Sequence, residues 1–438
     1  MELGFETIGN ATLICHDKGP VLVTDPWTDG SAYFGSWIHQ HTLPAQQLAD
    51  IRAAQYVWLS HGHPDHLSPA SLEHLRHADI LLPDHVGGRI LRELREQGHR
   101  AWVVKDGHWL ELSPNLRILS LANVFQDAVL LVDLGGRALV VNANDAGDRG
   151  ASDLVRRTVR RFPRSFLTAL MAHGDADMVN MFDEDGQRIA HPSALRTPLQ
   201  PGVLGHLKHY GIDAYVPFAT LHQYQREDSI WTNAHVTRPA DLAPRDEAEA
   251  QRLLPAYTRY DAVADHVSAL NPAAITAQPV DPRVFGDDWS ETLRPHDVDR
   301  IRAYFARFEH LTTFLGSVEF DVGGQIHRIE IAPEHRRGVR FATPRGSLMT
   351  CVEWDTFDDL MIGNFTRTTL LGDWKSKWSD ALYPDFNPFV TKFGDNGGAR
   401  TRAELRAYFA EYQRRGFTSF DDRPESRELE RALAPYLG

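Results

Sequence analysis

The nine residues 60–68 constrain this chain more than any other stretch. They read Ser-His-Gly-His-Pro-Asp-His-Leu-Ser, and four of them bind metal ions well: His61, His63, Asp65 and His66. The apolar run 56–59 before them predicts a buried strand. Ser68 and Pro69 after them form a pair typical of the start of a helix. The sequence therefore predicts a ligand-rich loop between a strand and a helix, where α/β sheets carry their chemistry.

The order of these ligands predicts two adjacent metal ions. His61 and His63 are two residues apart, so they point the same way in an extended segment. Asp65 and His66 follow a turn at Pro64 and can face back toward the first pair. Imidazole and carboxylate groups suit zinc, iron or manganese. The alternative is an ordinary polar loop in a chain that has 22 histidines, but the spacing and the strand–helix context favour a metal site.

The order His61-x-His63-x-Asp65-His66 resembles the HxHxDH signature of the metallo-β-lactamase-fold superfamily. The resemblance implies an α/β fold, a four-layer αββα sandwich that binds two divalent metal ions at one edge. It also implies that all four residues of the motif are metal ligands, and that Asp65 is catalytic as well.

Two positions further along the chain fit the same pattern. Asp145 follows the strand predicted at 138–141, where the superfamily has a metal-bridging aspartate, so the resemblance implies that Asp145 is both a ligand and catalytic. The alternative for Asp145 is a helix-capping aspartate. His222 follows the strand predicted at 214–219 and is the candidate for a closing histidine ligand. His173 is a weaker rival for that place.

Two features lie beside this pattern. Asp25, before Pro26, stands where the superfamily has an aspartate that orients a ligand, although a turn aspartate is the alternative. Asn123 stands where hydrolytic members usually have a third histidine ligand. Asn123 therefore predicts a centre with one ligand fewer, or one in which a carboxylate from Asp127 replaces the third histidine.

Several separate stretches are similar to the metal domain of the CMP-N-acetylneuraminate hydroxylases. They are 25–37, 60–68, 125–127, 142–145, 216–219 with Asn233, and 354–363. Those hydroxylases carry a Rieske iron–sulfur domain before the metal domain, and this chain has no cysteine and histidine cluster for such a centre. We therefore expect neither their substrate nor their internal electron route to carry over.

Two reactions fit these features. The first is a non-haem diiron oxygenase or monooxygenase that hydroxylates a small polar metabolite and draws electrons from an external donor of the ferredoxin type. The second is a binuclear zinc or manganese hydrolase of an ester, lactone or phosphoester, in which Asp65 and Asp145 hold the attacking water. The sequence favours the oxygenase, with iron as the metal. A metal-binding protein without catalysis is a third interpretation.

Composition limits the number of domains, the partners and the compartment that we expect. The chain has 438 residues, 42% of them hydrophobic, enough for one large core or two domains. A change to proline-rich, acidic sequence predicts a metal-binding core over 1–237 and an α+β accessory region over 238–438. A net charge of −13 argues against partners such as nucleic acid or a membrane surface. Two cysteines and no apolar membrane span or signal pattern predict a cytoplasmic protein.

Overall fold

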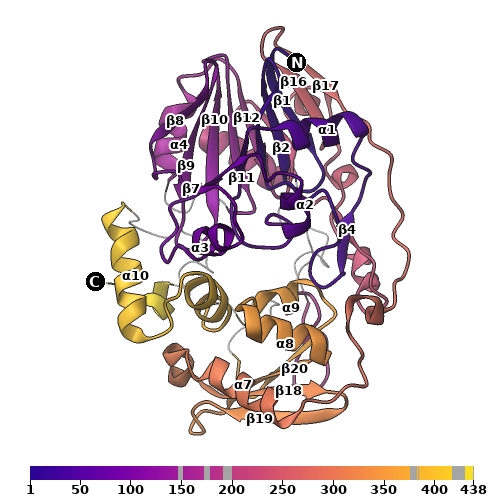
Figure 1. Cartoon of the computed structure of the whole chain (residues 1–438), viewed down its shortest axis with the longest axis vertical. Helices are drawn as coiled ribbons and strands as arrows, with labels where there is room; N and C mark the ends of the chain where they lie inside the picture. The colour runs from indigo at the N-terminus through magenta and orange to yellow at the C-terminus, as the bar shows by residue number, and fades with distance from the viewer. Residues whose placement is uncertain are drawn as a thin grey trace.

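The structure, a computed structural model of the chain, describes residues 1–146, 151–171, 178–190, 200–374, 382, 384–416 and 430–437. Two sheets lie in the upper half of Figure 1, and a smaller sheet with its helices lies below them. His173, the weaker ligand candidate, falls outside the described residues. Within the described part, no helix combines the length and the apolar character needed to cross a membrane.

The first sheet has eight strands in the order β17-β16-β1-β2-β3-β5-β6-β7. Their bounds are β1 Leu3–Ile8, β2 Thr12–Asp17, β3 Pro20–Thr24, β5 Tyr56–Trp58, β6 Asp79–Leu82, β7 Ala101–Val103, β16 Thr258–Asp261 and β17 His266–Ala269. Neighbours pair antiparallel from β17 to β3 and parallel from β3 to β7. The strand predicted at 56–59 is thus β5, inside the parallel half, and its carboxyl end opens into the ligand-rich loop.

The second sheet has six strands in the order β14-β12-β11-β10-β9-β8. Their bounds are β8 Trp109–Ser113, β9 Leu116–Ala122, β10 Ala128–Leu134, β11 Ala138–Asn144, β12 Ser165–Ala169 and β14 Ala214–Pro217. The hairpin predicted across Gly135 and Gly136 is the β10–β11 pair. The helices that belong to the two sheets are α1 Ala45–Ala53, α2 Pro69–Glu73, α3 Arg89–Glu96, α4 Ser152–Val159 and α5 Gln200–Tyr210.

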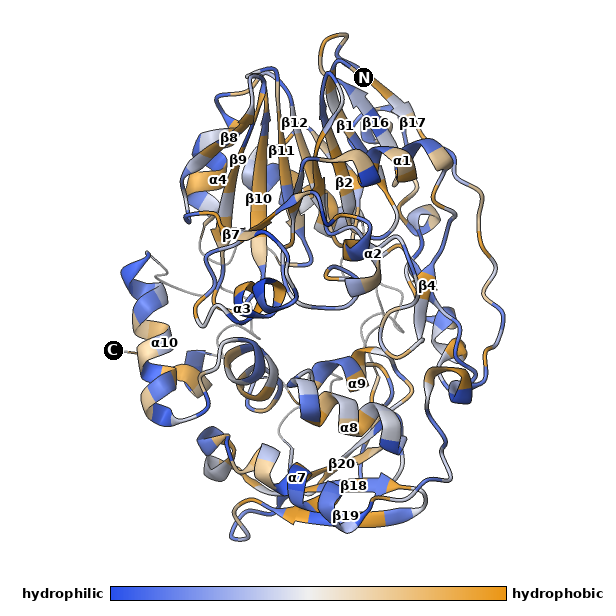
Figure 2. Cartoon of the chain, in the orientation of Figure 1, coloured by the Kyte–Doolittle hydropathy of each residue, from blue (hydrophilic) through white to orange (hydrophobic). Residues whose placement is uncertain are grey.

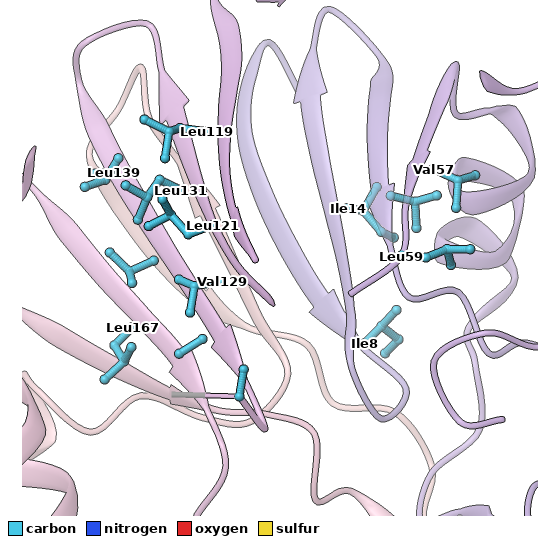
Figure 3. Packing of buried hydrophobic residues seen from close by; sticks show 14 of the residues in the cluster. Ile8, Ile14, Val57, Leu59, Leu119, Leu121, Val129, Leu131, Leu139 and Leu167 are labelled. Carbon is cyan, nitrogen blue, oxygen red and sulfur yellow. The ribbon is translucent and has the colours of Figure 1, made fainter. Parts of the chain in front are cut away.

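Alternating apolar residues form two hydrophobic sets, one between the sheets and one that packs with the helices. Along β10, Leu130 and Val132 belong to the layer between the sheets, and Leu131 belongs to the residues that pack with the helices. Phe5 of β1 meets Phe166 of β12 edge to face across the inner layer, with ring centroids 5.1 Å apart. Figure 2 shows apolar residues along β9 to β12, and Figure 3 shows members of the helix-facing set on both sheets. The predicted α/β sandwich is confirmed.

The C-terminal part carries a five-stranded sheet in the order β13-β21-β20-β18-β19. The strands are β13 Met181–Phe182, β18 Leu315–Val322, β19 Gln325–Glu330, β20 Arg337–Ala342 and β21 Arg367–Leu371; the helices are α6 Glu247–Ala250, α7 Pro295–Phe305, α8 Arg345–Trp354, α9 Asp358–Ile362, a π-helix Pro388–Asn396 and α10 Arg402–Arg414. The hairpin predicted around Gly323 and Gly324 is the β18–β19 pair. The predicted capping box of α10 also forms: Thr401 accepts a bond from the backbone of Glu404 and donates its own N–H to the Glu404 carboxylate.

Each of the two parts of the chain, before and after residue 237, contributes strands to the sheet of the other part. β16 and β17 lie beyond residue 237, yet they extend the eight-stranded sheet through the pairing of β16 with β1. β13 lies before residue 237, yet it pairs with β21 of the C-terminal sheet. The short strands β4 Trp37–His39 and β15 His222–Tyr224 form a separate two-stranded sheet. The division at residue 237 stays a prediction as a domain boundary, but the sandwich itself extends to Ala269.

A buried carboxyl group in the C-terminal part predicts a pH-dependent stability. Burial raises the pKa of Asp395 to about 7, the Tyr304 hydroxyl donates to one of its oxygens at 2.5 Å, and Arg307 lies 3.8 Å from the other. Because the folded state holds a proton that the unfolded chain releases near pH ~4, stability is lost as the pH rises toward 7. Asp395→Asn should therefore raise the Tm at about pH 8 and leave it nearly unchanged at about pH 4.

The exposed Asp299 of α7 offers the matched control for that measurement, since Asp299→Asn removes the same charge in solvent. Equal Tm changes at both pH values for Asp395→Asn would contradict the assignment of a protonated carboxyl group.

Candidate metal centre

The ligand-rich loop has the predicted setting. It follows β5, and α2 begins at Pro69 with the Ser68 hydroxyl accepting a bond from the backbone of Ser71. The N–H groups of His66 and Leu67 donate to the carbonyl of His63 at 3.0 and 2.8 Å, so the chain folds back after Pro64. Figure 1 places α2 at the edge of the sandwich that faces α8 and α9. The centre is therefore at the border between the two parts of the chain.

His61 and His63 form the first pair. Nε2 of His61 lies 2.9 Å from Nδ1 of His63, so one nitrogen of each ring faces the other. His61 is 2% exposed. The carboxylate oxygen Oδ2 of Asp145 lies 3.5 Å from the same Nε2 of His61. These three residues have ligand atoms within 4.8 Å of one another, close enough for one cation to contact all three.

Asp65 and His66 form the second pair. Nε2 of His66 lies 3.1 Å from Oδ2 of Asp65 and 3.7 Å from Oδ2 of Asp145. The rings of His61 and His66 have centroids 4.2 Å apart. Asp145 therefore lies between the two pairs, where the resemblance implied a bridging carboxylate. Five of the six predicted ligands meet at this place: His61, His63, Asp65, His66 and Asp145.

Asp145 also carries the clearest sign that the residues fit a metal ion. Its Oδ1 is buried and has no hydrogen-bond partner in the part of the chain that the structure describes. Burial raises the pKa of Asp145 to about 6, and the nearby charges of Asp127 and Asp65 act in the same direction. A buried carboxylate oxygen without a donor is costly unless a cation faces it. The donor set and this oxygen together fit a pair of divalent cations.

Outer contacts hold the second pair in place. Nδ1 of His66 lies 3.2 Å from Asp25, which also accepts bonds from the backbone of Ser60 at 2.7 Å and the side chain of Asn144 at 3.0 Å. This is the orienting contact that the resemblance implied for Asp25. Asp25 and Asn144 adopt left-handed backbone conformations, with φ of 43° and 56°. Strain of this kind in residues other than glycine gathers at functional sites.

Asn10 and Tyr33 hold Asp65, and the sequence interpretation did not assign either of them. The Asn10 amide donates to Oδ2 of Asp65 at 2.8 Å and the Tyr33 hydroxyl to Oδ1 at 2.6 Å. Burial opposes ionisation of Asp65, but His66 and the Tyr33 hydroxyl hold its pKa below the usual range. Tyr33 belongs to the aromatic loop before β4, and Asn10 to the turn between β1 and β2, so the only signal in the sequence was a polar residue in each loop.

His222 has a different environment. It lies on β15, and its ring stacks on Trp37 of the paired strand β4, with centroids 3.3 Å apart and planes at 4°. The groups of three or more ligand-type side chains that the described residues bring within 4.8 Å do not include His222. Its role as a ligand stays a prediction, and the strand pairing explains why the ring packs against an indole.

The place of the missing third histidine is occupied by a turn. Oδ1 of Asn123 accepts bonds from the backbone of Phe125 at 2.8 Å and of Asp127 at 3.3 Å. Oδ1 of Asp127 lies 3.9 Å from Nδ1 of His61, the nitrogen on the far side from His63. Asn123 thus stabilises the turn, and Asp127 lies near the ring nitrogen of His61 that faces away from His63.

We expect Asn123→Ala to lower the free energy of unfolding by about 1–3 kcal/mol, because two backbone donors lose their acceptor. Bound metal should stay unchanged. Urea unfolding and metal analysis of the same preparation check both statements. Loss of metal with unchanged stability would instead make Asn123 part of the centre.

The C-terminal part contributes two charged side chains to the centre. Nε2 of His63 lies 3.0 Å from Oδ2 of Asp358. The ammonium group of Lys392 lies 3.5 Å from the same nitrogen and 3.8 Å from Oδ1 of Asp127.

A further cluster, Glu6 with His16 and Asp50, lies on β1, β2 and α1. There Arg259 and Gln47 both donate to Glu6, as in an ion-pair network.

No protein-family model matches the chain. Among curated proteins it is similar to cytidine monophosphate-N-acetylneuraminic acid hydroxylases. It is 27% identical over 129 residues to the protein of Asterias rubens, which is 27% of this chain and 20% of that protein. It is 29% identical over 133 residues to the protein of Danio rerio, which is 28% of this chain and 22% of that protein. The matched part thus spans about a fifth of these relatives.

The chain combines a sandwich of two sheets with an HxHxDH loop after β5 and an aspartate after β11. The chain has the metallo-β-lactamase fold. The C-terminal part adds a sheet of its own to that fold.

Solved structures with likeness to this metallo-β-lactamase-fold chain include both hydrolases and a hydroxylase. Igni18, a metallo hydrolase from Ignicoccus hospitalis, has a TM-score of 0.38 at 14% identity and covers 61% of this chain and 99% of its own. CmlA, a diiron β-hydroxylase from Streptomyces venezuelae, has a TM-score of 0.33 at 15% identity and covers 54% of this chain and 47% of its own.

Proposed function

We propose that this chain is a non-haem diiron oxygenase that hydroxylates a small polar metabolite. The observation that carries the proposal is the composition of the centre. Histidine and carboxylate ligands meet there, while Asn123 holds a turn at the place where hydrolytic members have a further histidine. A centre with fewer imidazoles and more carboxylates suits iron and leaves positions open for oxygen and substrate.

Named residues would hold the two cations. His61, His63 and Asp145 face one position, and Asp65, His66 and Asp145 face the other. Iron in these positions supplies the redox chemistry, and zinc or manganese would supply Lewis acidity instead. Neighbouring residues orient these ligands. Asp25 fixes His66, and Asn10 with Tyr33 fixes Asp65.

The oxygenase reaction needs an electron source. Hydroxylation of a C–H bond by O₂ gives the alcohol and one water, and it consumes two electrons and two protons. The sequence has two cysteines, Cys15 and Cys351, and they lie in separate hydrophobic clusters, so they do not share an iron–sulfur centre. We therefore propose an external one-electron donor of the ferredoxin type as a partner.

The second candidate is a binuclear zinc or manganese hydrolase of an ester, lactone or phosphoester. The position of Asp145 favours it, because a carboxylate that reaches both ligand pairs could hold two cations close together, and two adjacent divalent cations would lower the pKa of a water held between them. Asp65 and Asp145 would then hold the attacking water.

Anaerobic purification followed by metal analysis separates the two reactions. The proposal expects iron in the protein as purified, and O₂ consumption when a reduced ferredoxin is added. His61→Ala is the matched control and should abolish that consumption. Tightly held zinc together with hydrolysis of bis(p-nitrophenyl) phosphate, lost in the same variant, would overturn the oxygenase in favour of the hydrolase.

A further inference from the structure

We propose that Asp358, on α9 of the C-terminal part, is a positioning residue that decides which nitrogen of His63 binds metal. The inference rests on the proposed metal centre. Asp358 lies 295 positions from His63 in the sequence, and it belongs to the C-terminal part and not to the sandwich. It also gives the C-terminal part a defined role in the chemistry of the centre.

The contact has the geometry of a charge-assisted hydrogen bond. Nε2 of His63 and Oδ2 of Asp358 are 3.0 Å apart, and the side chains are 13% and 6% exposed. A carboxylate accepts, so the proton of the neutral imidazole must sit on Nε2. The lone pair is then on Nδ1, and Nδ1 is the atom that faces His61 at 2.9 Å. The bond to Asp358 therefore selects the tautomer that the metal needs.

The fold holds Asp358 firmly in this position. The preceding residue, Phe357, is fully buried, and its ring packs against Phe341 at 5.2 Å and Phe305 at 5.4 Å between centroids. Lys392 from the π-helix lies 4.0 Å from the Asp358 carboxylate and balances its charge. A carboxylate anchored to a hydrophobic core keeps its partner ring oriented better than a surface side chain would.

The other half of the centre has the same arrangement. Asp25 contacts Nδ1 of His66 at 3.2 Å, which leaves Nε2 of His66 to face Asp65 and Asp145. In each pair, one imidazole thus has a carboxylate beside the ring nitrogen that faces away from the other ligands. For His66 the carboxylate comes from the sandwich, and for His63 it comes from the C-terminal part.

An alternative role for Asp358 is that of a metal ligand, because His63, Asp358 and Asp359 also have ligand atoms within 4.8 Å of one another. The ammonium group of Lys392 lies 3.5 Å from Nε2 of His63 and 4.0 Å from Oδ2 of Asp358, the two atoms that such a cation would contact. A fixed positive charge there opposes a second one. The positions of Lys392 and Asp358 therefore favour a hydrogen bond over direct ligation.

Cobalt(II) titration of the metal-free full chain tests the inference, with the visible absorption spectrum as a readout of the ligand set. Asp358→Ala should weaken Co²⁺ binding by roughly 10–100-fold and change the spectrum, as expected when a histidine ligand loses its outer partner. Asp358→Asn keeps an oxygen acceptor for the Nε2 proton and should recover most of the affinity and the wild-type spectrum.

Asp359→Asn is the matched control, because it replaces the neighbouring carboxyl group and leaves the bond between Asp358 and His63 in place. It should bind Co²⁺ nearly as wild type does. Circular dichroism and urea unfolding of the metal-free variants check the fold, and Asp358→Asn carries the test if Asp358→Ala does not fold.

Wild-type affinity and spectrum in Asp358→Ala would overturn the inference, and so would an Asn variant as weak as the Ala variant or an equal loss in Asp359→Asn. Failure of the metal centre itself looks different: the wild-type chain would then bind no Co²⁺, or His63→Ala would bind it unchanged.

Discussion

Asp145→Ala should leave the chain folded and remove most of its bound metal. Oδ2 of Asp145 lies 3.5 Å from His61 and 3.7 Å from His66, so its loss takes a ligand from both metal positions. The loss should exceed the roughly 10–100-fold that removal of an outer partner costs in affinity. His63→Ala should remove metal from one position. Metal analysis after gel filtration measures both effects.

Asp29→Ala is the control for these variants, because Asp29 is half-exposed and pairs with Arg52 at 3.9 Å, outside the group of predicted ligands. It should keep wild-type metal content. If Asp145→Ala and His63→Ala also kept it, the assignment of these ligands would be wrong.

Arg226→Ala should destabilise the protein by about 3–5 kcal/mol, because it leaves buried charge without its partner. The Arg226 side chain is 0% exposed and pairs with Asp287 and Asp228, both at 2.8 Å. It also donates to the carbonyl of Phe34 at 2.9 Å, in the loop that carries Tyr33. The variant should therefore show a lower midpoint in urea unfolding and weaker retention of metal.

The exposed pair of Arg283 with Asp281 gives the comparison. Its arginine is 72% exposed, and solvent screens the interaction, so Arg283→Ala should unfold at nearly the wild-type midpoint. Equal midpoints for Arg226→Ala and wild type would show that the buried network does not stabilise the fold.

Local sequence signals predicted single strands, turns and the ligand-rich loop, while the resemblance to the metallo-β-lactamase-fold superfamily implied the sandwich. The strand at 56–59, the ligand order after it and the helix start at Ser68 and Pro69 belong to one continuous stretch, so neighbouring residues determined each of them. The resemblance implied Asp145, and it could be applied because the hairpin before Asp145 joins two strands that are adjacent in sequence. Periodicity and turn chemistry act over such short distances, so they predict single elements but not how the two sheets pack together.

Contacts between distant residues could not be predicted in this way. Asp358 and Lys392 reach His63 from elements about 300 residues away, and no local pattern reports such a pairing. The return of β16 to pair with β1 placed part of the sandwich beyond residue 237 for the same reason. His222 stands where a ligand was expected in sequence, but the β4–β15 pairing directs its ring to Trp37.

The count of metal ions bound per chain tests the central claim most directly. Metal-free protein is titrated with Fe²⁺ under anaerobic conditions, and bound iron is measured after removal of the free ion. The two facing pairs with Asp145 between them predict about two ions per chain, and a His61→Ala, His66→Ala double variant should bind none tightly. A wild-type chain that takes up no ion, or a double variant that binds as many as wild type, would contradict the account.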